Sequence, residues 1–264
     1  MDISLSTTAE RISLDEASDN FVFQRSKLAY CKAAEFISGE VLEIGTGDGY
    51  GISYILPFAK HFTTVDKNNK PLRISIDQHF SLHVMKVKVP SLENFPDQSF
   101  ETVIIFQVIE HIQDDVKMIE EISRVLKPHG KLIISTPNKN MSLTRNPWHV
   151  REYTEEEFTV LLQKYFTEVN RYGVFGNEKV MGYYGKNKKS VENITRFDIL
   201  NFQHWLPRWM LRIPYDILNR INRRKLLLKD PRLTMSIEMN DYYIKPIYRN
   251  EEECFDLFYV ATKV

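Results

Sequence analysis

The sequence has few cysteines, no long apolar run, no net charge and no signal segment, and each absence argues against a class of protein. Its 264 residues include only two cysteines, Cys31 and Cys254, without CxxC or metal-ligand spacing, so we expect free thiols and no metal site. No run of about 18 apolar residues occurs, which argues against a membrane-spanning helix. The 35 basic side chains balance the 35 acidic ones, so the chain has no net positive charge that would attract nucleic acid. The first residues lack a basic segment followed by an apolar run, so we expect a cytoplasmic protein.

Short apolar runs alternate with helical segments along the first half of the chain. Apolar residues at roughly helical spacing predict a first helix over 21–37. The expected strands that follow are 41–44, 62–65, 84–89, 102–106 and 131–135. The helices expected between them are 51–59, 71–80 and 116–126. This alternation predicts an α/β fold, in which helices cover both faces of a parallel sheet.

The pattern changes after residue 135. Thr154 and Glu157 form an S/T-x-x-E capping box, which predicts a helix over 154–165. Aromatic and β-branched runs predict a sixth strand at 169–175 and a seventh at 255–261. The residues between these two strands form an excursion much longer than an ordinary connection.

A glycine-rich turn between the first strand and the next helix is the sharpest signal. The strand ends in an acid, Glu43, and Gly45, Gly47 and Gly49 follow it. Glycines let the backbone approach a ligand closely, and a helix N-terminus adds free N–H groups. Asp66 ends the next strand, where doubly wound folds place the ligand of a ribose hydroxyl. The combination predicts a nucleoside-containing cofactor.

The glycine spacing narrows the class of cofactor. The dinucleotide pattern G-x-G-x-x-G would need a third glycine at position 50, which is Tyr50. The segment from Glu43 to Gly49 reads E-x-G-x-G-x-G and resembles motif I of the class I S-adenosylmethionine (SAM)-dependent methyltransferases. Further segments resemble the same superfamily, in its order and most closely in its ubiquinone/menaquinone-methyltransferase-like (type 11) branch: 65–67, 95–104, 106–112 and 121–130.

The resemblance implies a fold and a cofactor. The fold would be a Rossmann-like doubly wound sheet of seven strands, the last antiparallel, with a helical insertion between strands six and seven. The cofactor would be SAM, and the product S-adenosylhomocysteine (SAH). The residues that the resemblance assigns to the cofactor are Glu43, Gly45, Thr46, Gly47, Asp66, Lys67, Ser91, Leu92 and Gln107.

Their implied roles differ. Glu43 would organise the methionine amino end, and Gln107 would lie beside the methionine portion. Asp66 would bind both ribose hydroxyls, and Lys67 would lie beside the adenine. Relatives often place an acid before the "LPF" segment to receive the adenine amino group, whereas this chain has Pro-Ser-Leu at 90–92. A backbone carbonyl or the Ser91 hydroxyl would replace it.

Two other segments contain candidate site residues. The segment 146–154 resembles the "NPxHxREYT" stretch of the same branch. Its His149 is a candidate general base, because histidine transfers protons near neutral pH, or else it holds the loop by hydrogen bonds. In the first helix, Arg25 and Tyr30 either reach the carboxylate of the cofactor or serve packing.

The long excursion is expected to form a cap. The predicted division is a flexible arm of residues 1–20, a SAM-binding domain of residues 21–176 plus 251–264, and a helical cap of residues 177–250. Between 186 and 229 there are eleven Lys/Arg and three Asp/Glu, interleaved with tryptophans. Arg220, Arg223 and Arg224 belong to this segment. The cap either contacts an anionic membrane or acceptor, or its charges simply face water.

The function expected is SAM-dependent methyl transfer to a small-molecule or lipid- or saccharide-linked acceptor. A nucleic-acid methyltransferase is the first alternative, but the D/N/S-P-P-aromatic motif is absent after the fourth strand, and neither cysteine follows a proline. An NAD(P)-dependent oxidoreductase conflicts with the glycine spacing, and a non-catalytic SAM-binding module stays open. The sequence determines neither the acceptor atom nor the oligomeric state.

Overall fold

The structure, a computed structural model, describes residues 17–68, 72, 80–196, 198, 202–248 and 253–264. The strands are β1 Glu40–Ile44, β2 His61–Asp66, β3 Leu82–Lys86, β4 Phe100–Phe106, β5 Leu126–Pro137, β6 Glu168–Gly176, β7 Tyr242–Pro246 and β8 Asp256–Thr262. The α-helices are α1 Asn20–Ala33, α2 Ile52–Ile55, α3 Asp115–Val125, α4 Glu155–Gln163, α5 Glu178–Thr195, α6 Phe202–Trp205, α7 Arg208–Lys229 and α8 Pro231–Ser236. Short 3-10 helices are η1 Ala17–Asp19, η2 Ala34–Phe36, η3 Leu56–Phe58, η4 Ile109–His111, η5 Lys139–Met141 and η6 Met239–Asp241.

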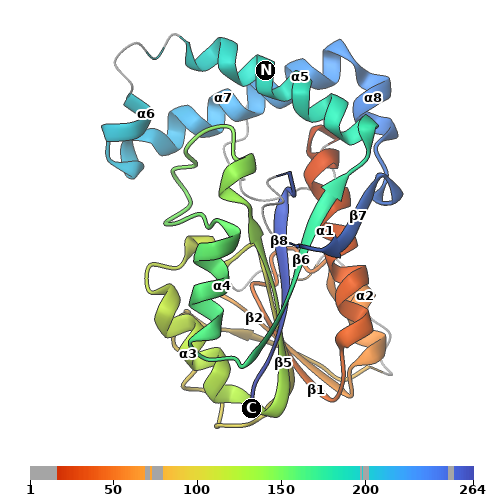
Figure 1. Cartoon of the computed structure of the whole chain (residues 1–264), viewed down its shortest axis with the longest axis vertical. Coiled ribbons are helices and arrows are strands. Elements are labelled where there is room, and N and C mark those ends of the chain that lie inside the picture. The colour runs from red at the N-terminus through yellow and green to blue at the C-terminus, as the bar shows by residue number, and fades with distance from the viewer. Residues whose placement is uncertain (1–16, 69–71, 73–79, 197, 199–201, 249–252) are drawn as a thin grey trace. The chain divides into compact units, whose positions relative to one another are not determined.

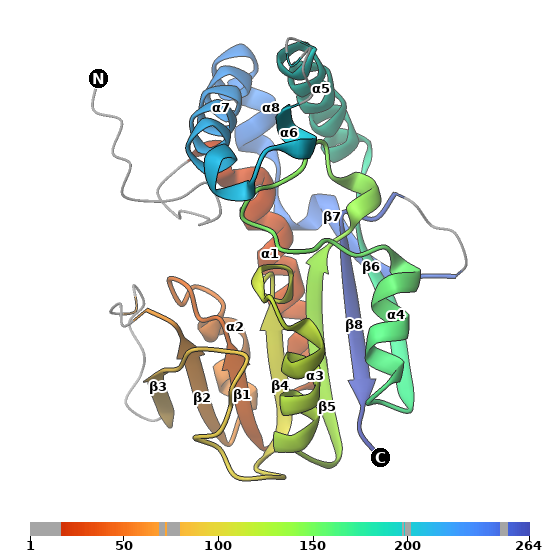
Figure 2. The same ribbon diagram turned by 90° about the vertical axis from the view of Figure 1, so that its left-hand side faces the viewer.

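One mixed sheet runs through the molecule. Its strand order is β3-β2-β1-β4-β5-β8-β6-β7, and Figure 2 shows most of these strands side by side in that order. β1 pairs in parallel with both β2 and β4, and β4 pairs in parallel with β5. β8 is antiparallel to its two neighbours, β5 and β6. The Rossmann-like α/β fold with an antiparallel last strand is therefore confirmed.

The expected number of strands was one too low. The described part of the sheet has eight strands, because β7 adds an edge strand beside β6. The insertion was expected to be helical, and β7 lies within it. Its sequence, Tyr-Tyr-Ile-Lys-Pro, is short and ends in proline. Such a strand is typical of a sheet edge, where a proline interrupts no ladder.

The order of the strands creates a topological switch point. From β1 the chain proceeds outward through β2 to β3, and it then returns to β4 on the other side of β1. In doubly wound folds, ligands bind at the carboxyl ends of the strands where the order reverses. Glu43, Asp66 and Gln107 lie at or just beyond the carboxyl ends of β1, β2 and β4.

Helices cover both faces of the sheet. Figure 1 shows α3 and α4 on one face and α2 on the other. The inner side of α3 is fully buried, with Met118, Ile119, Ile122 and Val125 in the core. The capping box that begins α4 is confirmed: Glu157 N donates to Thr154 Oγ1 at 3.3 Å, and Thr154 N donates to Glu157 Oε2 at 3.0 Å.

Two expected helices differ from the structure or lie outside it. The helix expected over 51–59 is only the single turn of α2, and Pro57 lies in the 3-10 turn η3 that follows. The helix expected over 71–80 lies outside the described residues, apart from Leu72 and Phe80. Both cysteines are free, and Cys254 is buried.

The chain divides into two compact units. One unit comprises residues 29–141, 150–175 and 244–264, and it contains most of the sheet. The other comprises, among the residues described, 17–28, 142–149 and those of 176–243. Within this second unit, Asn20 Nδ2 donates to the carbonyls of Thr234 and Ile237, and Arg223 forms a 2.6 Å ion pair with Asp19. Residues 17–28 therefore pack with the predicted cap. Over the residues described, no helix is both long and apolar enough to cross a membrane.

Candidate cofactor site

The turn after β1 is built on three glycines in the left-handed region of φ. Gly45, Gly47 and Gly49 have φ values of 92°, 57° and 81°. Gly45 N donates to the carbonyl of Val65 on β2 at 2.8 Å, and Gly49 N donates to the carbonyl of Thr46 at 2.9 Å. Residues other than glycine rarely adopt these φ values. The glycine spacing thus lets the chain turn sharply from β1 into α2.

The glycines are needed for different reasons. A Cβ at Gly45 would collide with Cγ2 of Val108, and a Cβ at Gly51 would collide with the ring of Tyr30. A Cβ at Gly47 would meet no described protein atom within 4 Å. Gly45 and Gly51 therefore serve packing within the protein, whereas the space beside Gly47 is open to a ligand.

Below the turn, the carboxylate of Glu43 is buried and held by two hydroxyl groups. Thr64 Oγ1 donates to Glu43 Oε2 at 2.6 Å, and the Tyr30 hydroxyl donates to Glu43 Oε1 at 3.0 Å. The hydroxyl of Thr46 contacts that of Thr64. Burial raises the pKa of Glu43 above its usual 4.5, although both hydrogen bonds counteract it, and burial also raises the pKa of Tyr30. An anion held in a dry site suits a cationic ligand group, which would offset its cost of desolvation.

Asp66 joins the ends of β1 and β2. Its Oδ2 accepts a hydrogen bond from Gly47 N at 3.1 Å, and its Oδ1 accepts one from Asn68 N at 2.8 Å. The half-buried carboxylate lies at the carboxyl end of β2, and Lys67 beside it is exposed. Asp66 therefore lies beside the open space at Gly47, where its oxygens can accept hydrogen bonds from a ligand's hydroxyls.

Gln107 adopts an unusual backbone conformation at the end of β4. Its φ is 54°, in the left-handed region that non-glycine residues rarely occupy. Gln107 N donates to the carbonyl of Ser135 at 2.9 Å, and its Nε2 lies 3.4 Å from Ser135 Oγ. Residues held in such conformations cluster at functional sites. This geometry turns the side chain of Gln107 across the end of β5.

Ser91 and Leu92 lie in the turn after β3 and differ in what they can offer. The side chain of Leu92 is buried, its N–H donates to Glu121 Oε2 at 3.1 Å, and its carbonyl accepts from Arg124 at 3.0 Å. The hydroxyl of Ser91 accepts a long hydrogen bond, 3.4 Å, from Glu93 N. Of the two expected adenine contacts, Ser91 is the one whose side chain can form a hydrogen bond with a ligand.

The candidate base belongs to the other compact unit. His149 Nε2 accepts a hydrogen bond from Asn146 Nδ2 at 2.9 Å, and the His149 carbonyl accepts one from Arg208 at 3.2 Å. Within its unit, then, His149 has the loop-holding contacts that were the alternative to a role as base. Arg25 also lies in this unit.

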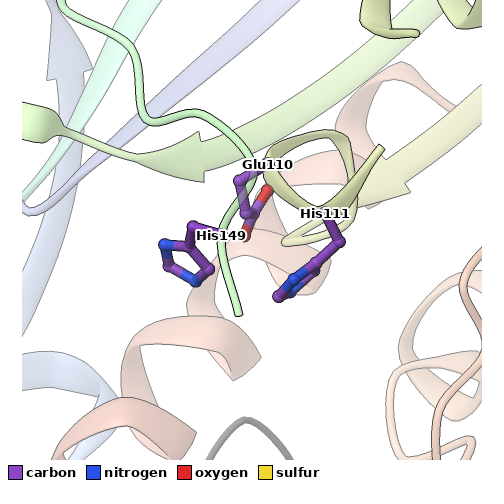
Figure 3. A group of neighbouring side chains, drawn as sticks. All are labelled: Glu110, His111 and His149. Atoms are coloured by element: carbon purple, nitrogen blue, oxygen red, sulfur yellow. The ribbon is translucent and has the colours of Figure 1, made fainter. Parts of the chain in front are cut away.

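The turn after β4 contributes a buried acid. Figure 3 shows Glu110 and His111 as neighbours on η4. Glu110 Oε2 accepts a hydrogen bond from Thr136 Oγ1 at 3.1 Å, and the Glu110 carbonyl accepts from Val150 N at 2.6 Å. Glu110 therefore ties η4 to β5 and to the start of the segment that leads to α4.

Two residues of the site were not expected from the sequence. Thr64 lies in an expected strand and Gly51 at an expected helix start, and neither pattern assigns them a further role. The parallel register pairs Glu43 with Thr64 directly, so aligning the two strands could have identified Thr64. The contact of Gly51 with the Tyr30 ring is tertiary, and no local pattern indicates it.

The comparisons agree with this geometry. Residues 42–134 match the family described as a methyltransferase domain. A probable SAM-dependent methyltransferase of Mycobacterium tuberculosis is 33% identical over 178 residues, which is 65% of this chain and 65% of that protein. A ubiquinone biosynthesis O-methyltransferase of Aeromonas salmonicida is 22% identical over 113 residues, 41% of this chain and 48% of that protein.

A solved structure agrees in fold. A SAM-dependent methyltransferase of Thermotoga maritima, described as a possible histamine N-methyltransferase, superposes with a TM-score of 0.55 at 18% identity and covers 92% of each chain. The match to the mycobacterial protein spans just under two thirds of either length. The predicted resemblance is confirmed: the methyltransferase-domain match over residues 42–134 and these relatives support a class I SAM-dependent methyltransferase of the type 11 branch.

Proposed function

We propose that the protein transfers the methyl group of SAM to a small-molecule or lipid- or saccharide-linked acceptor and releases SAH. One observation carries the proposal. The buried carboxylate of Glu43 lies beneath a glycine turn, the backbone of Gly47 faces open space, and the carboxylate of Asp66 lies beside that space.

The parts of SAM fit these residues chemically. Glu43 is suited to the cationic amino group of the methionine portion, and Asp66 is suited to the two ribose hydroxyls. The hydroxyl of Ser91 would receive the adenine amino group. Gln107 would lie beside the methionine portion and Lys67 beside the adenine. Gly45, Thr46 and Gly47 would supply backbone surface.

Beyond binding SAM, methyl transfer needs the protein mainly to position the acceptor. When bound, SAM supplies a methyl group already activated by the sulfonium, so holding the acceptor in line supplies much of the rate. Two roles stay predictions of this proposal: His149 as a general base, and residues 177–250 as a cap over the acceptor.

A thermal-shift experiment with SAM, SAH and NADH tests the proposal. A ligand at a hundredfold excess over its Kd adds about 2.7 kcal/mol of stability. We expect SAM and SAH to raise the Tm and NADH to leave it unchanged. A shift with NADH alone would favour an oxidoreductase. If SAM and SAH raise the Tm but no methylated product forms with any acceptor class, a non-catalytic binding module is favoured.

The nucleic-acid alternative is tested separately. The neutral charge of the chain argues against it. We expect no methylation of duplex DNA or of total RNA by the full chain with labelled SAM. Incorporation of label into either polymer would contradict the choice of a small or lipid-linked acceptor.

A further inference from the structure

Helix α7 has two unlike faces. Its inward side includes Asn222 and Leu226, which are buried in the unit formed with α5, α8 and η1. Its outward side has large apolar side chains that are exposed to solvent: Trp209 is 70% exposed, Ile213 65% and Leu228 80%. Large apolar side chains on an outer face commonly mark an interaction site when they are contiguous.

These outward side chains form one stripe. Trp209, Ile213, Ile217 and Ile221 recur every four residues, so they stack along one side of the helix. Leu228, seven residues after Ile221, continues the same side. We call these five residues the α7 ridge. The helix has 22 residues, so the ridge extends over about 30 Å at 1.5 Å per residue.

The charges of α7 are mostly positive. The helix contains seven Arg/Lys and a single acid, Asp216. That acid lies near the Trp209 end of the ridge and is already bonded within the unit, because Asp216 Oδ1 accepts a 2.9 Å hydrogen bond from Trp148 Nε1. Arg224 and Lys225 are exposed beside the ridge. Arg223, adjacent to them in the sequence, instead pairs with Asp19 within the unit.

We propose that the α7 ridge lies in the interface of an anionic membrane, with the helix parallel to the surface. An apolar stripe flanked by cations, on a helix not apolar enough to cross the bilayer, suits this position. A second copy of the chain is the poorer partner. Pairing two such helices through their ridges would bring the cations of both together without an acid between them.

The membrane-facing helix also holds the loop that contains His149. Besides the Trp148–Asp216 bond, Arg208 donates to the His149 carbonyl at 3.2 Å, and the Arg212 guanidinium lies 4.5 Å from the centre of the Trp148 ring. With the ridge in the lipid, this loop, which contacts the same helix, would lie within about one helix diameter, roughly 10 Å, of the surface. If the proposed function holds, an acceptor presented by a lipid anchor would reach that loop.

Vesicle co-sedimentation of the full chain tests the ridge. We expect binding to vesicles of phosphatidylcholine mixed with phosphatidylglycerol, weaker binding to phosphatidylcholine alone, and a steep decrease with salt. The double variant I213S/I217S should lose more than about tenfold in partitioning, because it removes two inserted side chains. R224Q and K225Q should each lose about fivefold on anionic vesicles. V160S is the matched control and should bind as the wild type, because Val160 on α4 is an apolar residue whose exposure (53%) lies between those of Ile213 (65%) and Ile217 (38%).

A depth measurement distinguishes insertion of the ridge from attraction by charge alone. Lipids brominated near the headgroup should quench the tryptophan fluorescence of the wild type, and W209F should reduce that quenching. Binding without quenching, or binding insensitive to I213S/I217S, would overturn the proposal. Failure of the wild type to bind vesicles at low salt would also overturn it. If the wild type instead forms a dimer that the I213S/I217S substitutions dissociate, the ridge is a self-association surface. None of these readouts needs SAM, so the result is independent of the thermal-shift test.

Discussion

The hydroxyl of Tyr30 donates a 3.0 Å hydrogen bond to the carboxylate of Glu43, while the ring of Tyr30 occupies the place of any side chain at Gly51. One tyrosine therefore connects α1 with the strand end and the helix start of the candidate site. The hydrogen bond is fully buried, so it has a low dielectric surrounding and no competing water. Several expected outcomes depend on this arrangement.

Tyr30→Phe keeps the ring and removes only the donor. Glu43 Oε1 then loses its partner in a buried site, and we expect a loss of about 1–3 kcal/mol in the free energy of unfolding at pH 7. Urea denaturation measures it. Tyr248→Phe is the control, because Tyr248 is exposed and should change little. Equal stability of wild type and Tyr30→Phe would mean that the bond contributes nothing.

Glu43→Gln should change how stability depends on pH. Burial raises the pKa of Glu43 in the folded protein above its usual 4.5. The folded state therefore binds more protons than the unfolded state, and this contribution to stability is complete below about pH 4.5 and is lost as the pH rises through the folded-state pKa.

The glutamine variant lacks this loss. We expect its stability relative to wild type to be greatest near pH 8 and to decline toward pH 4, with SAM binding weakened throughout. Thermal unfolding across this pH range, with and without SAM, gives both quantities. A constant difference between the two proteins at all pH values would contradict the assigned shift.

Gly45 and Gly47 should respond differently to the same substitution. Gly45→Ala introduces a collision with Val108 and should destabilise the apo protein strongly, by more than the left-handed φ alone would. Gly47→Ala costs about 1–2 kcal/mol for its φ and places a methyl group in open space. We expect Gly47→Ala to remain folded by circular dichroism and to lose SAM affinity by calorimetry. Unchanged affinity would mean that the ligand does not approach Gly47.

Asp66→Ala should weaken SAM binding without unfolding the chain. Two hydrogen bonds to a charged group, each about 1.5–3 kcal/mol, would be lost, which corresponds to about a hundredfold or more in Kd. Calorimetry with SAH gives the same information without turnover. Asp48→Ala, in the same turn, is the matched control, and equal losses for the two variants would remove the ribose assignment from Asp66.

The turn before β5 gives a test of stability alone. His129 has a φ of 62°, in the left-handed region that favours glycine. His129→Gly and His129→Ala both remove the imidazole, but only glycine adopts this φ without strain. We expect the glycine variant to be about 1 kcal/mol more stable than the alanine variant. Equal melting temperatures would show that the turn relaxes.

The sequence predicts the features that depend on short-range patterns. Local spacing locates the turn from Glu43 to Gly49, the acid Asp66 and the Thr154 capping box, and the structure has each where expected. Strand β7 escaped prediction because five residues at a sheet edge carry too little alternation to distinguish them from a loop. The shortness of α2 has a local cause, since Pro57 follows it.

What the sequence could not supply is the pairing of distant groups. The partners of Glu43 come from α1 and from β2, and the partner of Asp216 is Trp148, 68 positions away. Such contacts follow from register and packing, which no single local window contains. The ion pair of Arg223 with Asp19 is a further contact of this kind, because the two residues are remote in the sequence.

The place of β8 determines when the sheet can close during synthesis. β5 and β6 do not pair with each other, and each is joined instead to β8. A ribosome producing this chain therefore releases β5 and β6 long before the strand that connects them, with all of α5 to α8 emerging in between. Until then β5 has an unpaired edge, which can pair wrongly or bind a chaperone. The joining of β5 to β6 must therefore wait until residues 256–262 have left the ribosome.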